Sequence, residues 1–279
     1  FRARQMQEQA VRYMVRAGID PQGAVDVMDL FRGQEALSVG RRDPYASTHP
    51  LSADRIRVLQ RLAEPYKGRF TPSNSDLYWF ARAKGKLSAF QRNPKWTLTR
   101  AGESGFADVR AMREAIAYHR QSNLRKSLAA MDRALAARPN DPFYHELRGQ
   151  ILMESRQFAP ATAAYARAVN AAPKNALILG SYGRALLTQG QTAKALDVLE
   201  RARARDGRDV RVMRDLAAAH AKSGNAGLAS VVTAERYALI GRLDDAVIHA
   251  NRASGLLPRG SGAWQRAQDV LHAAKFAKR

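Results

Sequence analysis

The strongest constraint on the fold is a repeat with a period of about 34 residues, which runs from Asp108 toward the C-terminus. Residues of the same type recur at this interval: Ala134, Ala168 and Ala202; Gly149 and Gly183; Pro139 and Pro173. A period of this length is typical of paired helices that stack on their neighbours and share one continuous core. The sequence therefore predicts an all-α protein whose larger part is an α-solenoid.

The best-preserved unit shows what the repeated positions do. Gly149 lets the two helices of a pair approach closely, and Tyr165 fills the space between them. Ala161 and Ala168 give the second helix a seam of small residues, and Pro173 ends that helix. This pattern resembles the tetratricopeptide repeat. The resemblance implies a solenoid that binds protein, while the residues of the binding groove stay unassigned.

The phase of the repeat changes near the C-terminus. Ala253 lies 51 residues beyond Ala202, which is one and a half periods. The segment 226–240 is therefore predicted to serve both as the second helix of one pair and as the first helix of the next. A final helix from Ser261 to about Ala277 is predicted to cap the stack, because terminal units cover the exposed apolar side of a solenoid.

Composition and charge limit the classes of function. The chain carries a formal net charge of +21 and a pI near 10.9, which favours acidic partners. Nucleic acid is an unlikely partner, because the Arg residues are spread along the helical segments, where they are usually solvated. The absence of Cys excludes disulfides and thiolate zinc sites. No run of about 18 apolar residues occurs, so no transmembrane segment is expected.

The first hundred residues do not follow the repeat. One helix is predicted from about Gln5 to Arg16. Its apolar face is predicted to consist of Met6, Ala10, Tyr13, Met14 and Ala17. Asp20 and Pro21 are expected to start a second helix, and Ser52 is expected to cap a third helix that turns Ile56 inward. Residues 93–105 are predicted to be a linker.

Three short motifs in this region carry a more specific resemblance. They are Tyr13-Met14-Val15-Arg16-Ala17-Gly18-Ile19-Asp20-Pro21-Gln22-Gly23, then Asp43-Pro44-Tyr45, and then Ser47-Thr48-His49-Pro50-Leu51 followed by Asp54-Arg55-Ile56. With the repeats behind them, they resemble the end of the catalytic domain in the periplasmic zinc metallopeptidases of the HtpX and BepA kind. The resemblance implies that residues 1–105 are the C-terminal part of a metallopeptidase-like domain plus a linker. Residues 106–279 would then be the tetratricopeptide-repeat solenoid with its terminal capping helix.

The resemblance also implies a zinc site in the complete protein. In that family two histidines of an H-E-x-x-H helix and a later glutamate hold zinc, and the glutamate of H-E-x-x-H activates water. This chain contains no H-E-x-x-H, so no catalytic residue is assigned to it, and it is predicted to be inactive alone. Within Met6-Gln7-Glu8-Gln9-Ala10, Glu8 is a candidate third zinc ligand or else an exposed carboxylate. His49 is a candidate for a loop beside the zinc cleft, or else it only orders its own loop.

Two interpretations of function follow. By resemblance, the chain is the C-terminal portion of a zinc-dependent periplasmic endopeptidase of envelope protein quality control, and its start at Phe1 suggests a fragment. Its repeats would bind unfolded or stalled envelope proteins, or an outer-membrane assembly machinery. The alternative is a non-catalytic adaptor for protein–protein interaction, in which the first helices are the remnant of a peptidase. The altered motif around Glu8 favours this alternative.

Overall fold

The computed structural model describes residues 2–31 and 53–277, and every regular element within these ranges is a helix. The predicted all-α class is therefore confirmed. The chain divides into two compact units, Phe1–Trp79 and Phe80–Arg279. The predicted domain boundary between residues 105 and 106 rests on the repeat pattern and stays a prediction.

The first unit is a small cluster of helices. Its elements are α1 (Arg2–Arg16), α2 (Gln22–Leu30), α5 (Ala53–Ala63) and the 3-10 helix η1 (Glu64–Tyr66). Gly18, with φ 71°, ends the first helix, and Asp20 accepts a hydrogen bond of 2.9 Å from the backbone N–H of Gln22 at the start of the second. The helix α5 packs against both α1 and α2. The buried hydrophobic residues of this unit include Val11, Val25, Leu59 and Ala63, and Ile56 is turned inward as predicted.

The apolar face predicted for α1 is wrong. Met6 and Tyr13 are 69% and 65% exposed, whereas Val11 is buried against α5. The Gln7 side chain lies on the packed side and donates a 3.0 Å hydrogen bond to the Arg55 carbonyl. The helix thus has two apolar stripes, and only the position of α5 decides which of them is buried.

The helix α6 (Asn74–Gln91) is followed by α7 (Pro94–Thr99) and by the 3-10 helix η2 (Ala101–Ser104). The segment predicted as a linker, residues 93–105, is therefore largely helical. Asn93 caps α7 by accepting a 2.9 Å hydrogen bond from the Lys95 N–H, and both α7 and η2 pack on the next helix. The guanidinium of Arg113 reaches back to the Ala101 carbonyl at 3.2 Å.

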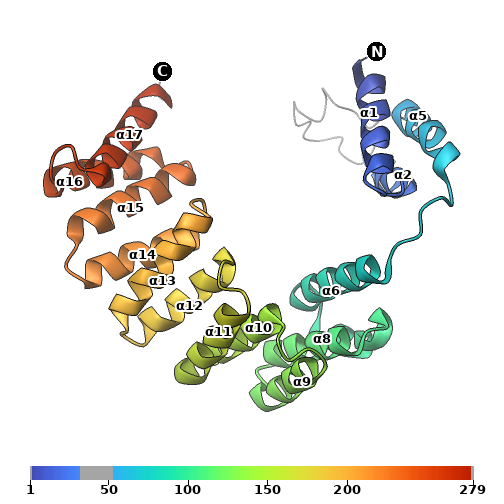
Figure 1. Ribbon diagram of the computed structural model, residues 1–279, viewed down its shortest axis with the longest axis horizontal. Helices are drawn as coiled ribbons and strands as arrows, with labels where there is room; N and C mark the ends of the chain where they lie inside the picture. The colour runs from blue at the N-terminus through green and yellow to red at the C-terminus, as the bar shows by residue number, and fades with distance from the viewer. Residues whose placement is uncertain (1, 32–52, 278–279) are drawn as a thin grey trace. The chain divides into compact units, whose positions relative to one another are not determined.

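The remainder of the second unit is a stack of helix pairs (Figure 1). Its helices are α8 (Ala107–Arg120), α9 (Leu124–Ala137), α10 (Pro142–Glu154), α11 (Phe158–Ala171), α12 (Ala176–Thr188), α13 (Thr192–Arg205), α14 (Val210–Lys222), α15 (Ala226–Leu239), α16 (Leu243–Leu256) and α17 (Gly262–Ala277). Asp141, Asn175 and Asp209 cap α10, α12 and α14 by accepting backbone N–H hydrogen bonds. Successive caps are one period apart, so the repeat fixes the start of each first helix.

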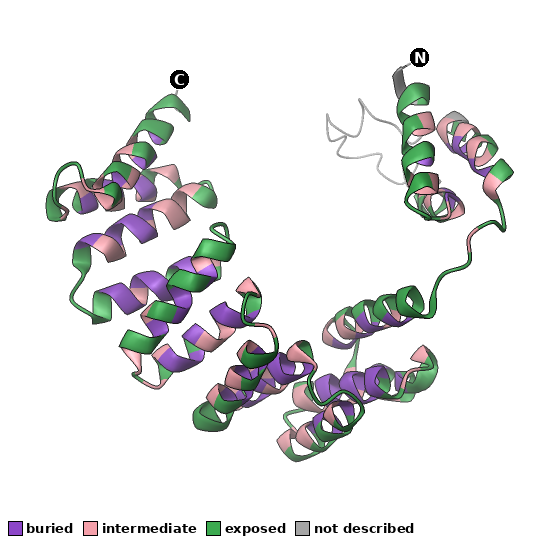
Figure 2. Ribbon diagram, in the orientation of Figure 1, coloured by how far each residue is buried: buried purple, intermediate pink, exposed green. Residues whose placement is uncertain are grey.

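The predicted seam of small residues is confirmed. Ala161, Ala168, Ala195 and Ala202 are fully buried. Figure 2 shows the buried residues of α8–α15 on the sides where these helices meet. Since Ala side chains leave little space between helix axes, each pair packs at close distance. The buried residues form successive clusters along the stack, and Tyr182 packs against two of them.

The predicted change of phase is confirmed as well. The helix α15 packs extensively against both α14 and α16, so it belongs to two pairs. Ala234 of α15 and Ala250 of α16 are both fully buried in the core that these helices share. The terminal helix α17 packs on α15 and α16 and buries Ala267 and Val270 there.

Candidate functional site

The first helices of successive pairs, α10, α12 and α14, form one surface, which we call the first-helix face. Neighbouring first helices contact each other along the stack. Phe143, Leu177 and Arg211 occupy equivalent places at the start of these helices, one period apart, and all three are exposed. In solenoids of this type, a surface repeated in this way binds extended partners. The sequence analysis left these residues unassigned, although their spacing marks them.

One end of the first-helix face is covered by α6. Arg82 of α6 makes two 2.6 Å hydrogen bonds to the Asp141 carboxylate at the start of α10. The same guanidinium lies 4.0 Å from the centre of the Tyr144 ring. Gly85 of α6 lies on α8, where a Cβ would meet the Val109 side chain at 3.2 Å. The helix α6 is thus held against α8 and α10 by a buried ion pair and close packing.

A buried carboxylate lies at this junction. Glu146 of α10 is only 7% exposed, and its Oε2 lies 3.6 Å from the Lys86 ammonium of α6. Burial raises the pKa of Glu146, while the nearby Lys86 ammonium and Ser181 hydroxyl oppose this rise. Three helices therefore meet around one acidic group.

Between α12 and α14 the first-helix face has a shallow depression of about 50 Å³. Its lining includes Gly180, Ser181, Arg184 and Asp215. Asp215 pairs with Arg184 at 3.9 Å and with Arg214 at 2.9 Å. A small-molecule pocket usually has a volume of about 300–1,000 Å³. The depression is therefore too small to enclose a ligand. It can contact the surface of a partner protein through its charged groups.

The two site residues predicted from the sequence have different outcomes. Glu8 lies in α1, where its carboxylate pairs with the Arg4 guanidinium at 3.1 Å. His49 lies outside the described residues. Within residues 2–31 and 53–277, no group of three His, Cys, Asp or Glu side chains is placed to hold a metal ion. The described residues therefore do not form a zinc site on their own, and the roles of Glu8 and His49 stay predictions.

Histidines in the repeats instead have local partners. His119 pairs with Glu154 at 2.6 Å, and His145 Nε2 lies 2.8 Å from the Pro139 carbonyl. These contacts join neighbouring helices or hold a loop. The contacts therefore give these histidines a structural role. Their spacing in the sequence also does not suit a pair of metal ligands on one helix.

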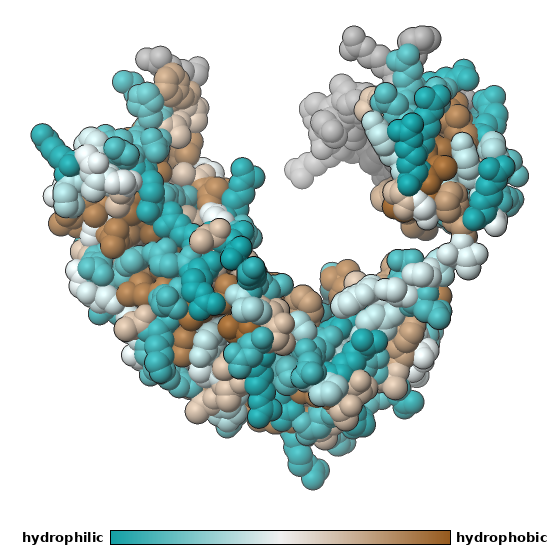
Figure 3. Space-filling model, in the orientation of Figure 1, coloured by the Kyte–Doolittle hydropathy of each residue, from teal (hydrophilic) through white to brown (hydrophobic). Residues whose placement is uncertain are grey.

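The described helices include none that is both long enough and apolar enough to cross a lipid bilayer. In Figure 3 the visible face of the unit Phe80–Arg279 is mainly hydrophilic, with smaller hydrophobic patches between the helices. Scattered patches of this kind are normal on a protein surface and mark no site by themselves.

Comparison with known proteins agrees with this class of fold. Residues 152–219 match the family model described as Tetratricopeptide repeat. A fragment of MamA, 41-end, from Desulfovibrio magneticus RS-1 superposes with a TM-score of 0.50 at 17% identity, and the match covers 61% of this chain and 98% of that one. The MamA RS-1 ArsTM double mutant also gives 0.50, at 18% identity, with 61% and 97% covered. At these identities, the likeness supports the solenoid fold alone.

More specific relatives exist among curated proteins. The Beta-barrel assembly-enhancing protease of Escherichia coli (strain K12) is 25% identical over 260 residues, which cover 90% of this chain and 52% of the relative. The protein of the same name from Shigella flexneri gives the same values. The chain thus spans about half the length of these relatives. The tetratricopeptide-type repeats make protein–protein interaction the general role of the second unit.

Proposed function

We propose that this chain is the C-terminal portion of a zinc-dependent endopeptidase of envelope protein quality control, and that its repeats bind a protein substrate or partner. The observation that carries the proposal is the alignment with the Beta-barrel assembly-enhancing proteases. It is 260 residues long and covers 90% of this chain, so it extends beyond the repeats into the first unit. A likeness limited to tetratricopeptide repeats would not reach these helices.

In this proposal the repeats bind the substrate protein, and the remainder of the longer protein cleaves it. The first-helix face offers Phe143 and Leu177 to apolar segments of a partner, and Arg184 and Asp215 to its polar groups. Unfolded or stalled envelope proteins expose such apolar segments, and an outer-membrane assembly machinery is the other candidate partner. The proposed location is the periplasm, and the zinc would belong to the complete protein.

The exposed stripe of α1 supports the peptidase part of the proposal. Met6 and Tyr13 are large apolar side chains that lie two helical turns apart on one side of the helix and remain uncovered within their own unit. Another helix of a peptidase domain could cover this stripe in the longer protein. Covering it would remove from water an apolar surface that costs about 25 cal/mol for each Å² exposed.

A non-catalytic adaptor is the second candidate. The observation that favours it is the arrangement around the predicted third ligand. Glu8 is paired with Arg4 on the same helix, and the neighbouring Gln7 is used to bind α5. An adaptor would keep the partner-binding solenoid and need no metal at α1.

The test is the zinc content and casein cleavage of the full-length gene product, measured beside the 279-residue chain and with a chelator control. We expect one zinc per full-length chain and chelator-sensitive cleavage, with neither property in the chain alone. Absence of both from the full-length product would overturn the peptidase and leave the adaptor.

The contribution of Glu8 can be measured in the same full-length product. If Glu8 is the third ligand, Glu8→Ala should release zinc and lower cleavage by more than about tenfold. Glu64→Ala is the matched control, because Glu64 is also an exposed carboxylate of the first unit paired with a basic residue, Lys67. Equal zinc content in the two variants would remove Glu8 from the site.

A further inference from the structure

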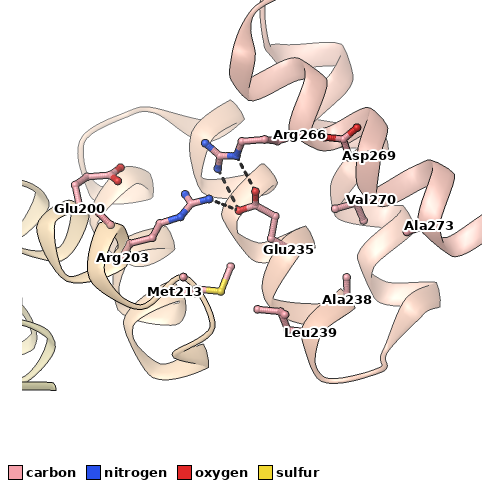
Figure 4. A pocket seen from close by; sticks show the side chains of 12 residues that line it. Glu200, Arg203, Met213, Glu235, Ala238, Leu239, Arg266, Asp269, Val270 and Ala273 are labelled. Atoms are coloured by element: carbon pink, nitrogen blue, oxygen red, sulfur yellow. Dashed lines mark hydrogen bonds and ion pairs between the residues drawn. The ribbon is translucent and has the colours of Figure 1, made fainter. Parts of the chain in front are cut away.

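The second helices of the pairs, α9, α11, α13 and α15, lie on the side of the repeats away from the first-helix face, and we call this side the second-helix face. A cavity of about 660 Å³ lies there. Side chains from α13, α14, α15 and α17 surround the cavity (Figure 4). Its apolar wall includes Met213, Ala238, Leu239 and Val270. This volume is within the range of about 300–1,000 Å³ in which proteins enclose ligands or side chains of a partner.

The change of phase in the repeat explains why the cavity is large. An equivalent groove occurs one period earlier, over Leu179, which takes the place of Met213 in its own repeat. A further groove lies beside His145. These grooves have volumes of about 360 and 370 Å³. At the third position α15 also acts as the first helix of the next pair, so α17 packs beside it and adds a further wall. The groove there is larger and stays open to solvent.

Three charged side chains fix the walls relative to one another. Glu235 of α15 accepts a 2.7 Å hydrogen bond from Arg203 of α13, and two bonds of 2.7 and 3.1 Å from Arg266 of α17. Both arginines point at the same carboxylate in Figure 4. The two guanidinium groups are thus engaged with the protein itself, and they link α13 and α17 to α15.

Two further carboxylates at the cavity are available to a ligand. Glu200 is half exposed, and the hydrogen bond from His220, 3.2 Å away, lowers the pKa of Glu200 and keeps it ionised. Asp269 is exposed and makes no hydrogen bond or ion pair within the part of the chain that the structure describes. With Glu235, these acids outnumber Arg203 and Arg266, so the lining is acidic although the chain carries a net charge of +21.

We propose that this cavity binds a segment of a partner protein in which neighbouring apolar side chains stand next to a lysine or arginine. The apolar side chains enter between Met213, Leu239 and Val270. The cation reaches Glu200 or Asp269 at the edge, where an opposite charge adds affinity and selectivity. This site is separate from the first-helix face, and the proposal does not depend on a peptidase origin of the chain.

The test is an NMR titration of the 279-residue chain with three capped peptides. The first is acetyl-Gly-Leu-Phe-Lys-Gly-amide, the second has Glu in place of Lys, and the third has two Ser in place of Leu-Phe. We expect the first peptide to bind about tenfold or more tightly than the others and to shift the methyl signals of Leu239 and Val270. Equal binding of all three, or shifts confined to other methyl groups, would overturn the proposal.

Two pairs of variants locate the site. Ala273→Trp fills the cavity from its edge and should abolish binding of the first peptide, whereas Ala163→Trp, at the separate groove beside His145, should leave binding unchanged. Asp269→Lys should weaken binding about tenfold, whereas Asp197→Lys, on the exposed side of α13, should not. Unchanged binding in Ala273→Trp would contradict the assignment. Failure of the zinc and casein tests would leave all four results unaffected.

Discussion

Gly149 of α10 lies directly against the ring of Tyr165 of α11: a Cβ on Gly149 would meet two ring carbons at 2.7 Å. One period later, a Cβ on Gly183 would meet the Leu199 side chain at 2.6 Å. Any side chain at these positions would push the two helices of a pair apart. The glycines are therefore required by packing, since neither has a positive φ.

Gly149→Ala should destabilise the second unit. The added methyl must displace a buried Tyr165 ring, which costs about 1–3 kcal/mol as overpacking, against a gain of about 1 kcal/mol in helix propensity. We expect a net loss of up to about 2 kcal/mol and a lower urea midpoint. Gly255→Ala is the control, because nothing lies within 4 Å of a Cβ there. It should be neutral or stabilising, and equal midpoints for both variants would contradict the packing argument.

The ion pair between Arg82 and Asp141 should hold α6 on the repeats. The two side chains are only 7% and 10% exposed, so removing one partner leaves a charge buried without its counter-ion. Arg82→Met should cost about 3–5 kcal/mol and speed hydrogen exchange of the α6 amides. The double variant Arg82→Met/Asp141→Asn should recover part of the loss, because it removes the stranded charge and keeps a capping side chain. Unchanged exchange in Arg82→Met would show that α6 is held in another way.

The same pair should make stability depend on acid pH. Burial alone would raise the pKa of Asp141, but the hydrogen bonds and charge of Arg82, with the N–H groups of Tyr144 and Phe143, hold it below the ordinary value of 3.8. A lowered pKa contributes stability that is present above pH 3.8 and is lost as pH falls through the pKa of the folded state. Urea unfolding between about pH 5 and pH 2 should show this loss, and Asp141→Asn should show less of it.

Glu146 should have the opposite dependence on pH. Its pKa is raised by burial, so the folded state binds the proton more tightly than the unfolded chain does. Stability is then lost as pH rises above the ordinary value of 4.5 and through the pKa of the folded state. Glu146→Gln should therefore gain stability relative to the original chain as pH rises from 4.5 toward neutrality. Urea midpoints at the two pH values measure this gain, and a constant difference between the two proteins would refute it.

The repeat part could be predicted almost completely from the sequence. Gly149, Tyr165 and Ala168 interact within one pair of neighbouring helices, and the same contacts recur once in every period. Local contacts of this kind are visible as periodicity because each unit packs only on the units beside it. The double role of α15 could also be predicted, because the interval of 51 residues between Ala202 and Ala253 shows the change of phase in the sequence.

The exposed side of α1 and the packing of α6 could not be predicted in this way. Met6 and Val11 belong to two different apolar stripes of α1, and only the docking of α5 determines that Val11 is buried. Arg82 and Asp141 are far apart in the sequence, and no periodic signal connects them.

For this protein the sequence alone determined the helical class, the solenoid and its change of phase, because these depend on contacts between neighbours in the chain. The tertiary structure decided where the first-helix face is covered, and it brought Arg203, Glu235 and Arg266 from three helices to one cavity. Pairing of charges over long sequence distances depends on how helices pack, and packing is cooperative over the whole unit. Such sites therefore become visible only once the helices are in place.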